Sequence, residues 1–233
     1  MNIVITGASR GIGKAIACKL ASPQNQLALI ARNVTDLQDI INELHDIGCH
    51  AIAFSGDVTD EKKVAEIVAH VEEYFGHIDV LINNAGVGLF RELEEITAEE
   101  WDTVMDTNVK GTFLFCKSIV PMMKNRGKGH IISITSDVSR RTFATGTLYC
   151  ASKHAQDALL AALRKEVQPF GIKVSTILPG LTDTYFNDTV QGHERKQDWL
   201  KSIDIAEAVL YVMNAPEYVV IDEIMLHPIT QNY

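Results

Sequence analysis

The chain has 233 residues, of which 46% are hydrophobic and 22% are charged, a composition typical of a soluble globular protein with one large domain or two small ones. Its formal net charge of −9 argues against a nucleic-acid or anionic-membrane surface, because both require clustered Lys and Arg. No apolar run reaches the roughly 18 residues of a membrane span, and the residues after Met1 have neither the basic region nor the cleavage site of a signal peptide. We therefore expect a cytoplasmic protein that acts on small molecules and has no nucleic-acid or membrane partner.

The cysteines and histidines do not indicate a disulfide framework or a metal site. Cys18, Cys49, Cys116 and Cys150 form no C-x-x-C pair and lie in apolar or helical stretches, so we predict reduced thiols in the core. The His193-Glu194 pair lacks the second His of an H-E-x-x-H motif. We expect no catalytic metal.

Short β-branched runs alternate with long amphipathic stretches along the whole chain. The runs predict strands at residues 2–6, 27–31, 50–55, 80–82, 130–134, 173–177 and 223–226. Helical periodicity predicts helices at residues 13–21, 35–47, 62–75, 99–124, 148–168 and 205–213. Thr97 begins a capping-box sequence, and Asp204 is the predicted N-cap of the last helix.

This alternation predicts an α/β fold. A parallel sheet of about seven strands, doubly wound in the Rossmann manner with helices on both faces, accounts for the element order. We find no linker or repeat, so we expect residues 1–233 to form one domain. The one irregular segment, residues 185–203, interrupts it as an insertion that we expect to form a lid over the substrate.

The first predicted strand leads into a glycine-rich turn, Thr6-Gly7-Ala8-Ser9-Arg10-Gly11-Ile12-Gly13. In a doubly wound sheet this turn is the usual seat of a dinucleotide pyrophosphate, which the N-terminus of the following helix attracts. The pattern fails the P-loop consensus because no Ser or Thr follows Lys14. We therefore predict a dinucleotide site rather than a kinase or ATPase.

The end of the second predicted strand indicates which dinucleotide binds. An acidic residue there would hold the ribose 2′-hydroxyl of NAD, whereas an arginine accepts the 2′-phosphate of NADP. The chain has Arg32-Asn33 at this point, and Arg10 lies in the glycine turn. Because a guanidinium matches a phosphate well, we expect NADP(H) rather than NAD.

Tyr149 and Lys153 are spaced so that a phenol and an amine meet on one helix face. A nearby ammonium favours the phenolate, so it should lower the pKa of Tyr149 and make its proton easier to donate. Such a pair suits a carbonyl that is becoming an alkoxide.

With these features the chain resembles the short-chain dehydrogenase/reductase family over nearly its whole length. The matching motifs are T-G-x3-G-x-G at residues 6–13, D-V at Asp57-Val58, N-N-A-G at residues 83–86, the family's Asn at Asn108, its Ser at Ser136, Y-x3-K at Tyr149 and Lys153, and P-G-x3-T at Pro179, Gly180 and Thr184. The resemblance implies that Asn108, Ser136, Tyr149 and Lys153 are catalytic. It implies a cofactor site formed by Gly7, Ser9, Arg10, Gly11, Ile12, Gly13, Arg32, Asn33, Asp57, Val58, Asn84, Ala85, Gly86, Tyr149, Lys153, Pro179, Gly180, Thr182 and Thr184.

The resemblance also implies a role for each catalytic residue. Tyr149 would donate a proton to the carbonyl oxygen, and Ser136 would hydrogen-bond the same oxygen. Lys153 would lower the pKa of Tyr149 and hold the nicotinamide ribose. Asn108 would interrupt its helix and hold a water that links Lys153 to solvent.

We therefore expect an NADPH-dependent carbonyl reductase, reversible as an alcohol dehydrogenase, of the small type that acts on hydroxy acids, diketones or pterin-like ketones. An NADP-binding sensor or scaffold without turnover is an alternative. An epimerase or dehydratase of the extended branch is another, although such chains usually have a larger C-terminal region. The helices at 99–124 and 148–168 carry apolar residues on more than one face, including Phe113, Leu114, Phe115, Ile119, Leu159, Leu160, Leu163 and Val167. Together with the resemblance, this pattern predicts a homodimer or homotetramer.

Overall fold

Seven parallel strands form the central sheet of the structure, a computed structural model that describes residues 1–232, with Asp188 described by its backbone alone. The strands are β1 (Asn2–Thr6), β2 (Gln26–Ala31), β3 (His50–Ser55), β4 (Val80–Asn83), β5 (Gly129–Ile134), β6 (Ile172–Pro179) and β9 (Glu223–Leu226). Their order is β3-β2-β1-β4-β5-β6-β9, and every neighbouring pair is parallel. The predicted doubly wound fold is confirmed.

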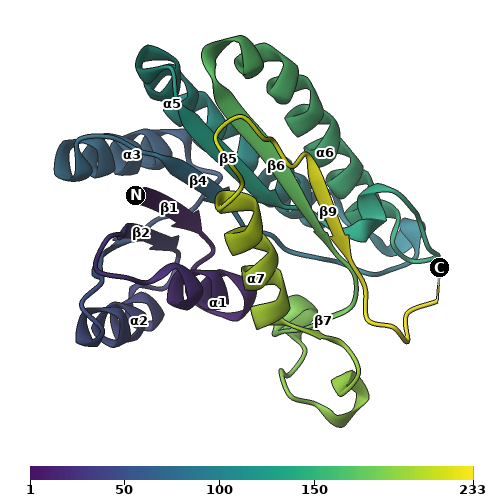
Figure 1. Cartoon of the computed structure of the whole chain (residues 1–233). Coiled ribbons are helices and arrows are strands. Elements are labelled where there is room, and N and C mark those ends of the chain that lie inside the picture. The colour runs from purple at the N-terminus through teal and green to yellow at the C-terminus, as the bar shows by residue number, and fades with distance from the viewer. Residues whose placement is uncertain (233) are drawn as a thin grey trace.

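Helices cover both faces of this sheet (Figure 1). On one face lie α1 (Gly11–Leu20), α2 (Val34–Asp46) and α7 (Ser202–Met213), whose apolar side chains share one core cluster with β1, β2 and β4. On the other lie α3 (Glu61–Phe75), α5 (Gly111–Arg126) and α6 (Thr147–Val167), which form a second cluster. Because both faces are covered, every residue of β1, β4 and β5 is buried, which explains why these strands appear in the sequence as nearly continuous apolar runs.

The helix predicted at residues 99–124 is divided in the structure. It consists of α4 (Ala98–Met105), a π-helical turn (Asp106–Lys110) and α5. The apolar periodicity runs through the turn, so periodicity alone predicted one unbroken helix, whereas the family resemblance implied an interruption at Asn108. The predicted capping box at the start of α4 is present: Thr97 Oγ1 accepts a hydrogen bond from Glu100 N–H (3.2 Å), and Glu100 accepts one from Thr97 N–H (3.1 Å).

Two smaller predictions are wrong. Asp204 is not the N-cap of α7, because the helix begins at Ser202 and Lys201 occupies the N-cap position. Asp204 instead lies in the first turn, where its carboxylate accepts a hydrogen bond from Lys201 N–H (2.7 Å). Cys18 is not a core thiol, since it is exposed on α1, whereas Cys49, Cys116 and Cys150 are buried.

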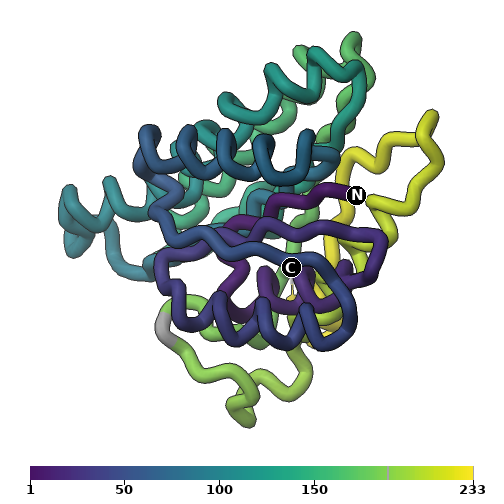
Figure 2. The backbone as a smooth tube through the Cα atoms, turned by 90° about the vertical axis from the view of Figure 1, so that its left-hand side faces the viewer, coloured from purple at the N-terminus to yellow at the C-terminus, as the bar shows by residue number. Residues whose placement is uncertain are grey.

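Residues 185–203 project from the body of the molecule (Figure 2). The base of this segment is closed by a short parallel pair that the sequence did not predict, β7 (Thr182–Asp183) and β8 (Leu200–Lys201). Buried Asp183 holds the segment together: its carboxylate accepts hydrogen bonds from Gly192 N–H (2.9 Å) and Lys201 Nζ (3.3 Å). Between β7 and β8 the chain forms two single turns, Phe186–Asp188 and Glu194–Lys196.

Candidate active site

A cleft of about 460 Å³ opens at the carboxyl ends of the strands. The predicted cofactor residues that line it are Gly7, Ser9, Arg10, Gly11, Ile12, Arg32, Asn33, Asp57, Val58, Asn84, Ala85, Gly86, Tyr149, Lys153, Pro179, Gly180, Thr182 and Thr184, and Ser136 lines it as well. Of the predicted site residues, Gly13 and Asn108 do not line the cleft. Their contacts show what each does instead.

The glycine turn packs against the end of β4 too closely for side chains. Gly7 has φ +64°, and a Cβ there would lie 2.8 Å from the Cα of Ala85. A Cβ on Gly13 would lie 2.2 Å from the carbonyl oxygen of Gly7 and 2.6 Å from Asn84 Nδ2. Gly13 therefore allows α1 to pack against the turn, and the turn presents the open N-terminus of α1 to the cleft.

Asn84 ties this turn to β4. Its Nδ2 donates hydrogen bonds to the carbonyl oxygens of Thr6 and Gly7, both at 3.0 Å. Thr6 Oγ1 in return accepts hydrogen bonds from the backbone N–H groups of Asn84 (3.0 Å) and Ala85 (3.1 Å). The first and third motifs of the sequence thus form one hydrogen-bonded unit at the floor of the cleft.

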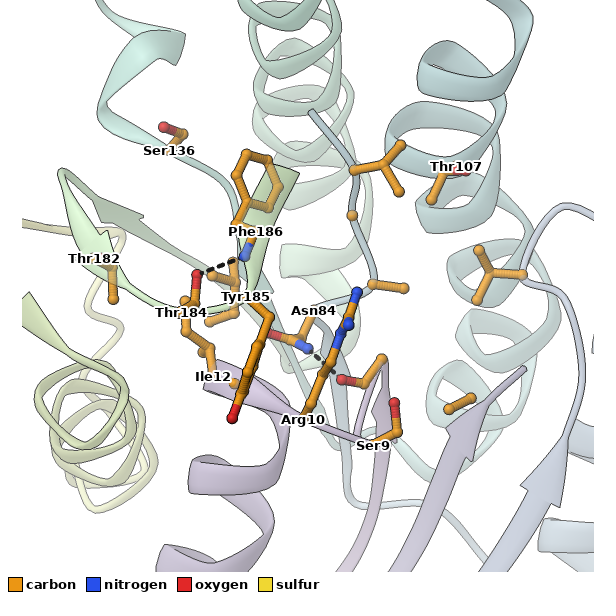
Figure 3. A pocket seen from close by; sticks show the side chains of 18 of the residues that line it. Ser9, Arg10, Ile12, Asn84, Thr107, Ser136, Thr182, Thr184, Tyr185 and Phe186 are labelled. Carbon is orange, nitrogen blue, oxygen red and sulfur yellow. Dashed lines mark hydrogen bonds between the residues drawn. The ribbon is translucent and has the colours of Figure 1, made fainter. Parts of the chain in front are cut away.

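Two arginines and one aspartate line the part of the cleft formed by the turns after β1 and β2. Arg32 and Arg10 both line the cleft, and the Arg10 guanidinium lies 5.8 Å from the centre of the Tyr185 ring (Figure 3). Asn33 also caps α2, because its side chain accepts a hydrogen bond from Thr35 N–H (3.0 Å). Asp36, which the sequence did not single out, lines the same end from the first turn of α2.

Asp57 lies at the carboxyl end of β3 and does not cap the next helix. Its Oδ1 accepts hydrogen bonds from the backbone and hydroxyl of Thr59, both at 2.9 Å, whereas Asp60 is the N-cap of α3. Asp57 and Val58 therefore line the cleft from a loop.

Ser136, Tyr149 and Lys153 meet at the other end of the cleft. All three side chains are buried, at 7%, 8% and 3% exposure. Lys153 Nζ lies 5.9 Å from the centre of the Tyr149 ring and donates hydrogen bonds to Gln156 Oε1 (2.9 Å) and the carbonyl oxygen of Ile134 (3.4 Å). Ser136 stands at the end of β5, on the adjoining wall.

The pKa values of this pair do not follow the sequence-based expectation. Burial raises the pKa of Tyr149 above its usual value of 10.0; the Ser136 side chain opposes this effect, and the negative charge of Asp137 adds to it. Burial also lowers the pKa of the Lys153 ammonium to about 7. The predicted lowering of the Tyr149 pKa by Lys153 is not found: loss of hydration is the largest effect, and Lys153 is not among the groups that shift this pKa.

Asn108 lies in the π-helical turn and is fully buried. Its Oδ1 accepts a hydrogen bond from Val87 N–H (2.9 Å), and its Nδ2 donates to the carbonyl oxygen of Val87 (2.9 Å) and to Ser152 Oγ (3.0 Å). The side chain thus joins the loop after β4 to α6. The predicted interruption of the helix is present.

Asp137, which directly follows Ser136, is a functional neighbour that the sequence did not indicate. Its buried Oδ1 accepts a hydrogen bond from Ser136 Oγ (3.2 Å), while Oδ2 accepts hydrogen bonds from Arg141 Nε (2.8 Å) and Gln231 Nε2 (2.7 Å). Gln231 Oε1 accepts a hydrogen bond from Leu181 N–H (2.8 Å). The C-terminal residues therefore hold the loops after β5 and β6 together.

The loop after β6 supplies the remaining wall. Thr182 Oγ1 donates to the carbonyl oxygen of Gly180 (2.9 Å), and Thr184 Oγ1 accepts from Phe186 N–H (3.1 Å). Tyr185 and Phe186 point in opposite directions from this loop, Tyr185 toward Arg10 and Phe186 toward the Ser136 end (Figure 3). Within residues 1–232, no group of three or more His, Cys, Asp or Glu side chains is arranged to hold a metal ion. None of the described helices is long and apolar enough to cross a membrane.

Comparison with known proteins agrees with this geometry. A family model described as short chain dehydrogenase matches residues 1–195. An oxidoreductase of Staphylococcus epidermidis, itself uncharacterised, is 35% identical over 97% of this chain and 96% of its own.

Two solved structures superpose closely. The alcohol dehydrogenase of the archaeon Thermococcus sibiricus, complexed with 5-hydroxy-NADP, is 37% identical with a TM-score of 0.94, covering 100% of this chain and 98% of that one. The closed form of a serine dehydrogenase complexed with NADP⁺ is 29% identical with a TM-score of 0.92, covering 100% and 97%. By the family match and these likenesses, the chain belongs to the short-chain dehydrogenase family and is an oxidoreductase.

Proposed function

We propose that the protein reduces a ketone of a small molecule to an alcohol with NADPH, reversibly, with Tyr149 as the proton donor. The observation that carries this proposal is the meeting of buried Ser136, Tyr149 and Lys153 at one end of a cleft whose other end is the glycine turn. This arrangement suits a carbonyl held beside a nicotinamide, and the solved relatives named above were obtained with NADP or a derivative of it.

The cleft fits NADP(H) in shape and charge. The close approach of backbone at Gly7 and Gly13 leaves a cradle for a pyrophosphate at the N-terminus of α1. Arg10 and Arg32 would hold the 2′-phosphate, and Asp57 and Val58 would border the adenine. Asp36 also lines the cleft, and the negative charge of its carboxylate works against the binding of the 2′-phosphate.

The cofactor, when bound, supplies the hydride, and the chain supplies the proton and the positioning. A phenol is protonated at neutral pH, as a donor in the direction of reduction must be, although burial raises the pKa of Tyr149 and makes its proton harder to lose. Ser136 Oγ would give a second hydrogen bond to the carbonyl oxygen as negative charge develops there. Lys153 would hold the ribose hydroxyls and, when protonated, would favour loss of the Tyr149 proton.

Asn108 would hold a water that carries protons to Lys153. Gly86 supports this role, because a Cβ there would lie 3.3 Å from Asn108 Oδ1 and 3.6 Å from Lys153 Nζ, so the missing side chain leaves space between the two. A water needs polar partners on at least two sides, and these groups provide them.

Residues 185–203 would form the lid of the site within this single domain, since the segment joins the cleft at Tyr185 and Phe186 and is closed at its base by β7 and β8. We also propose a homodimer or homotetramer and a cytoplasmic location. In the single chain, Phe113 is exposed on α5, whereas Leu114, Phe115, Ile119, Leu160 and Val167 are already buried. Light scattering at micromolar concentration tests the assembly, and a monomer would refute it.

A substrate panel tests the function. The protein with NADPH and a set of ketones, diketones and oxo acids should oxidise NADPH, followed by its absorbance, and should use NADH less well. Tight NADPH binding without reduction of any carbonyl compound would contradict the proposed enzyme activity and favour an NADP-binding sensor.

A further inference from the structure

Three phenylalanines from three different loops form an aromatic cluster with Tyr149. Phe90 follows β4, Phe143 follows β5, and Phe186 lies in the segment after β7. The ring of Tyr149 lies 5.5 Å from that of Phe90 and 5.4 Å from that of Phe186, and Phe90 lies 5.5 Å from Phe143, measured between ring centres. These distances are those of directly packed aromatic rings.

Two glycines make room for this cluster. A Cβ on Gly88 would lie 2.5 Å from Cε1 and Cζ of Phe186, and a Cβ on Gly146 would lie 2.6 Å from Cζ of Phe143. A backbone hydrogen bond from Arg91 N–H to the carbonyl oxygen of Thr145 (2.9 Å) fixes the loop of Phe90 against the loop of Phe143. The rings are therefore held in place by the backbone beneath them.

The cluster is open to a ligand. Phe90 and Phe143 are each 38% exposed, although burial of a ring of this size away from water is favourable. Phe186 lines the cleft beside Tyr149. Of the three rings only Phe186 lines the cleft, while Phe90 packs on Tyr149 and Phe186, and Phe143 packs on Phe90. An apolar group attached to a carbonyl at Tyr149 would therefore meet Phe186 first and the other two rings beyond it.

The arginines on the loops of Phe90 and Phe143 are already paired. Arg91 binds Glu100 at 2.7 Å, Arg140 binds Asp157 at 2.6 Å, and Arg141 binds buried Asp137 at 2.5 Å. A substrate carboxylate would have to break one of these pairs to obtain a cation from the loops of Phe90 and Phe143. The contacts around Tyr149 therefore favour an uncharged apolar group over an acid.

We propose that the substrate carries a flat, uncharged ring next to its carbonyl, and that Phe90, Phe143 and Phe186 form the subsite that selects it. This inference rests on the proposed carbonyl reduction, which it makes more specific by excluding simple oxo acids as preferred substrates.

Three compounds that share an acetyl ketone test it, since acetylbenzoyl, diacetyl and pyruvate differ in carrying a phenyl, a methyl or a carboxylate oxygen at the next carbon. With NADPH, kcat/KM should be highest for acetylbenzoyl, about tenfold or more above diacetyl, and lowest for pyruvate. Phe90→Leu, Phe143→Leu and Phe186→Leu should each raise KM for acetylbenzoyl and reduce its advantage over diacetyl by several-fold. Tyr74→Leu is the matched control, because Tyr74 is an exposed ring on α3 stacked on His50, far along the chain from these loops.

The outcomes separate this inference from the proposed function. Turnover of pyruvate as good as that of acetylbenzoyl, or an aryl preference unchanged in all three phenylalanine variants, would overturn the subsite while leaving the reductase intact. Absence of NADPH oxidation with every carbonyl compound would overturn both. Because the ranking of the three compounds is measured on the unaltered protein, the test does not depend on the folding of any variant.

Discussion

Replacement of Gly13 by Ala tests how the glycine turn is built. Gly13 does not line the cleft, so its contribution to cofactor binding must act through packing. The added Cβ would lie 2.2 Å from the carbonyl oxygen of Gly7 and 2.6 Å from Asn84 Nδ2. Either α1 must move away from the turn or Asn84 must give up its hydrogen bond to Gly7.

The expected cost follows from these two contacts. Overpacking in a closely packed region costs about 1–3 kcal/mol, and each lost hydrogen bond adds about 0.5–1.5 kcal/mol. For a domain of this size 1 kcal/mol shifts the melting temperature by about 2–4 °C, so Gly13→Ala should melt roughly 5–15 °C lower. Because the displaced turn forms the floor of the cleft, the Kd for NADPH should rise about tenfold or more.

Thermal unfolding and titration of NADPH fluorescence measure the two effects. Gly76→Ala is the matched control: its φ of +77° makes Ala strained, but the added Cβ would meet no atom within 4 Å, and α3 ends there away from the cleft. It should lose about 1 kcal/mol of stability and bind NADPH as the unaltered protein does. A Gly13→Ala protein with normal melting and a normal Kd would refute this account of the turn.

Three further predictions concern other groups. Burial lowers the pKa of His130 from 6.5 to about 4, so the unfolded chain takes up a proton first as the pH falls. About 3 kcal/mol of the free energy of unfolding should therefore be lost between pH 6.5 and pH 4. Urea unfolding at several pH values measures this loss in the unaltered protein, and the loss should vanish in His130→Gln. Arg141→Leu should lower stability by about 1–3 kcal/mol, because buried Asp137 loses a paired cation, and Asp137→Leu in the same chain should restore part of it; equal stability of Arg141→Leu would contradict the pairing. Arg32→Asp should shift preference from NADPH toward NADH by about tenfold or more, measured as a ratio of kcat/KM values, and no shift would show that the phosphate is held elsewhere.

Much of the fold followed from the sequence because the strands are buried on both faces. Runs such as Ile3-Val4-Ile5 contain no polar residue and are therefore recognised as buried strands, and the helices between them carry regular apolar stripes. The features that periodicity did not predict are very short elements and elements that depend on contacts between residues far apart in the chain. The β7 and β8 strands have two residues each, too few for a pattern. The interruption at Asn108 came from the family resemblance and not from periodicity, because it depends on hydrogen bonds to Val87 that periodicity does not encode.

The candidate site likewise has features that the sequence predicted and features that it did not. Its glycine turn and the Tyr149–Lys153 pair are local patterns with a fixed spacing, and the structure brings them to one cleft. Asp137 and Gln231 are 94 positions apart, so their hydrogen bond has no signature in the sequence. The aromatic cluster joins three loops, and the raised pKa of Tyr149 arises from burial, which a pattern of residues cannot measure.

The role of Tyr149 as proton donor is the central claim, and Tyr149→Phe tests it most directly. Single-turnover oxidation of bound NADPH by a carbonyl substrate should slow by about 10²–10⁴-fold, because the general acid is lost. The Kd for NADPH should stay within about threefold, since the phenol hydroxyl is a small part of the cleft. A near-normal rate in Tyr149→Phe would contradict the account.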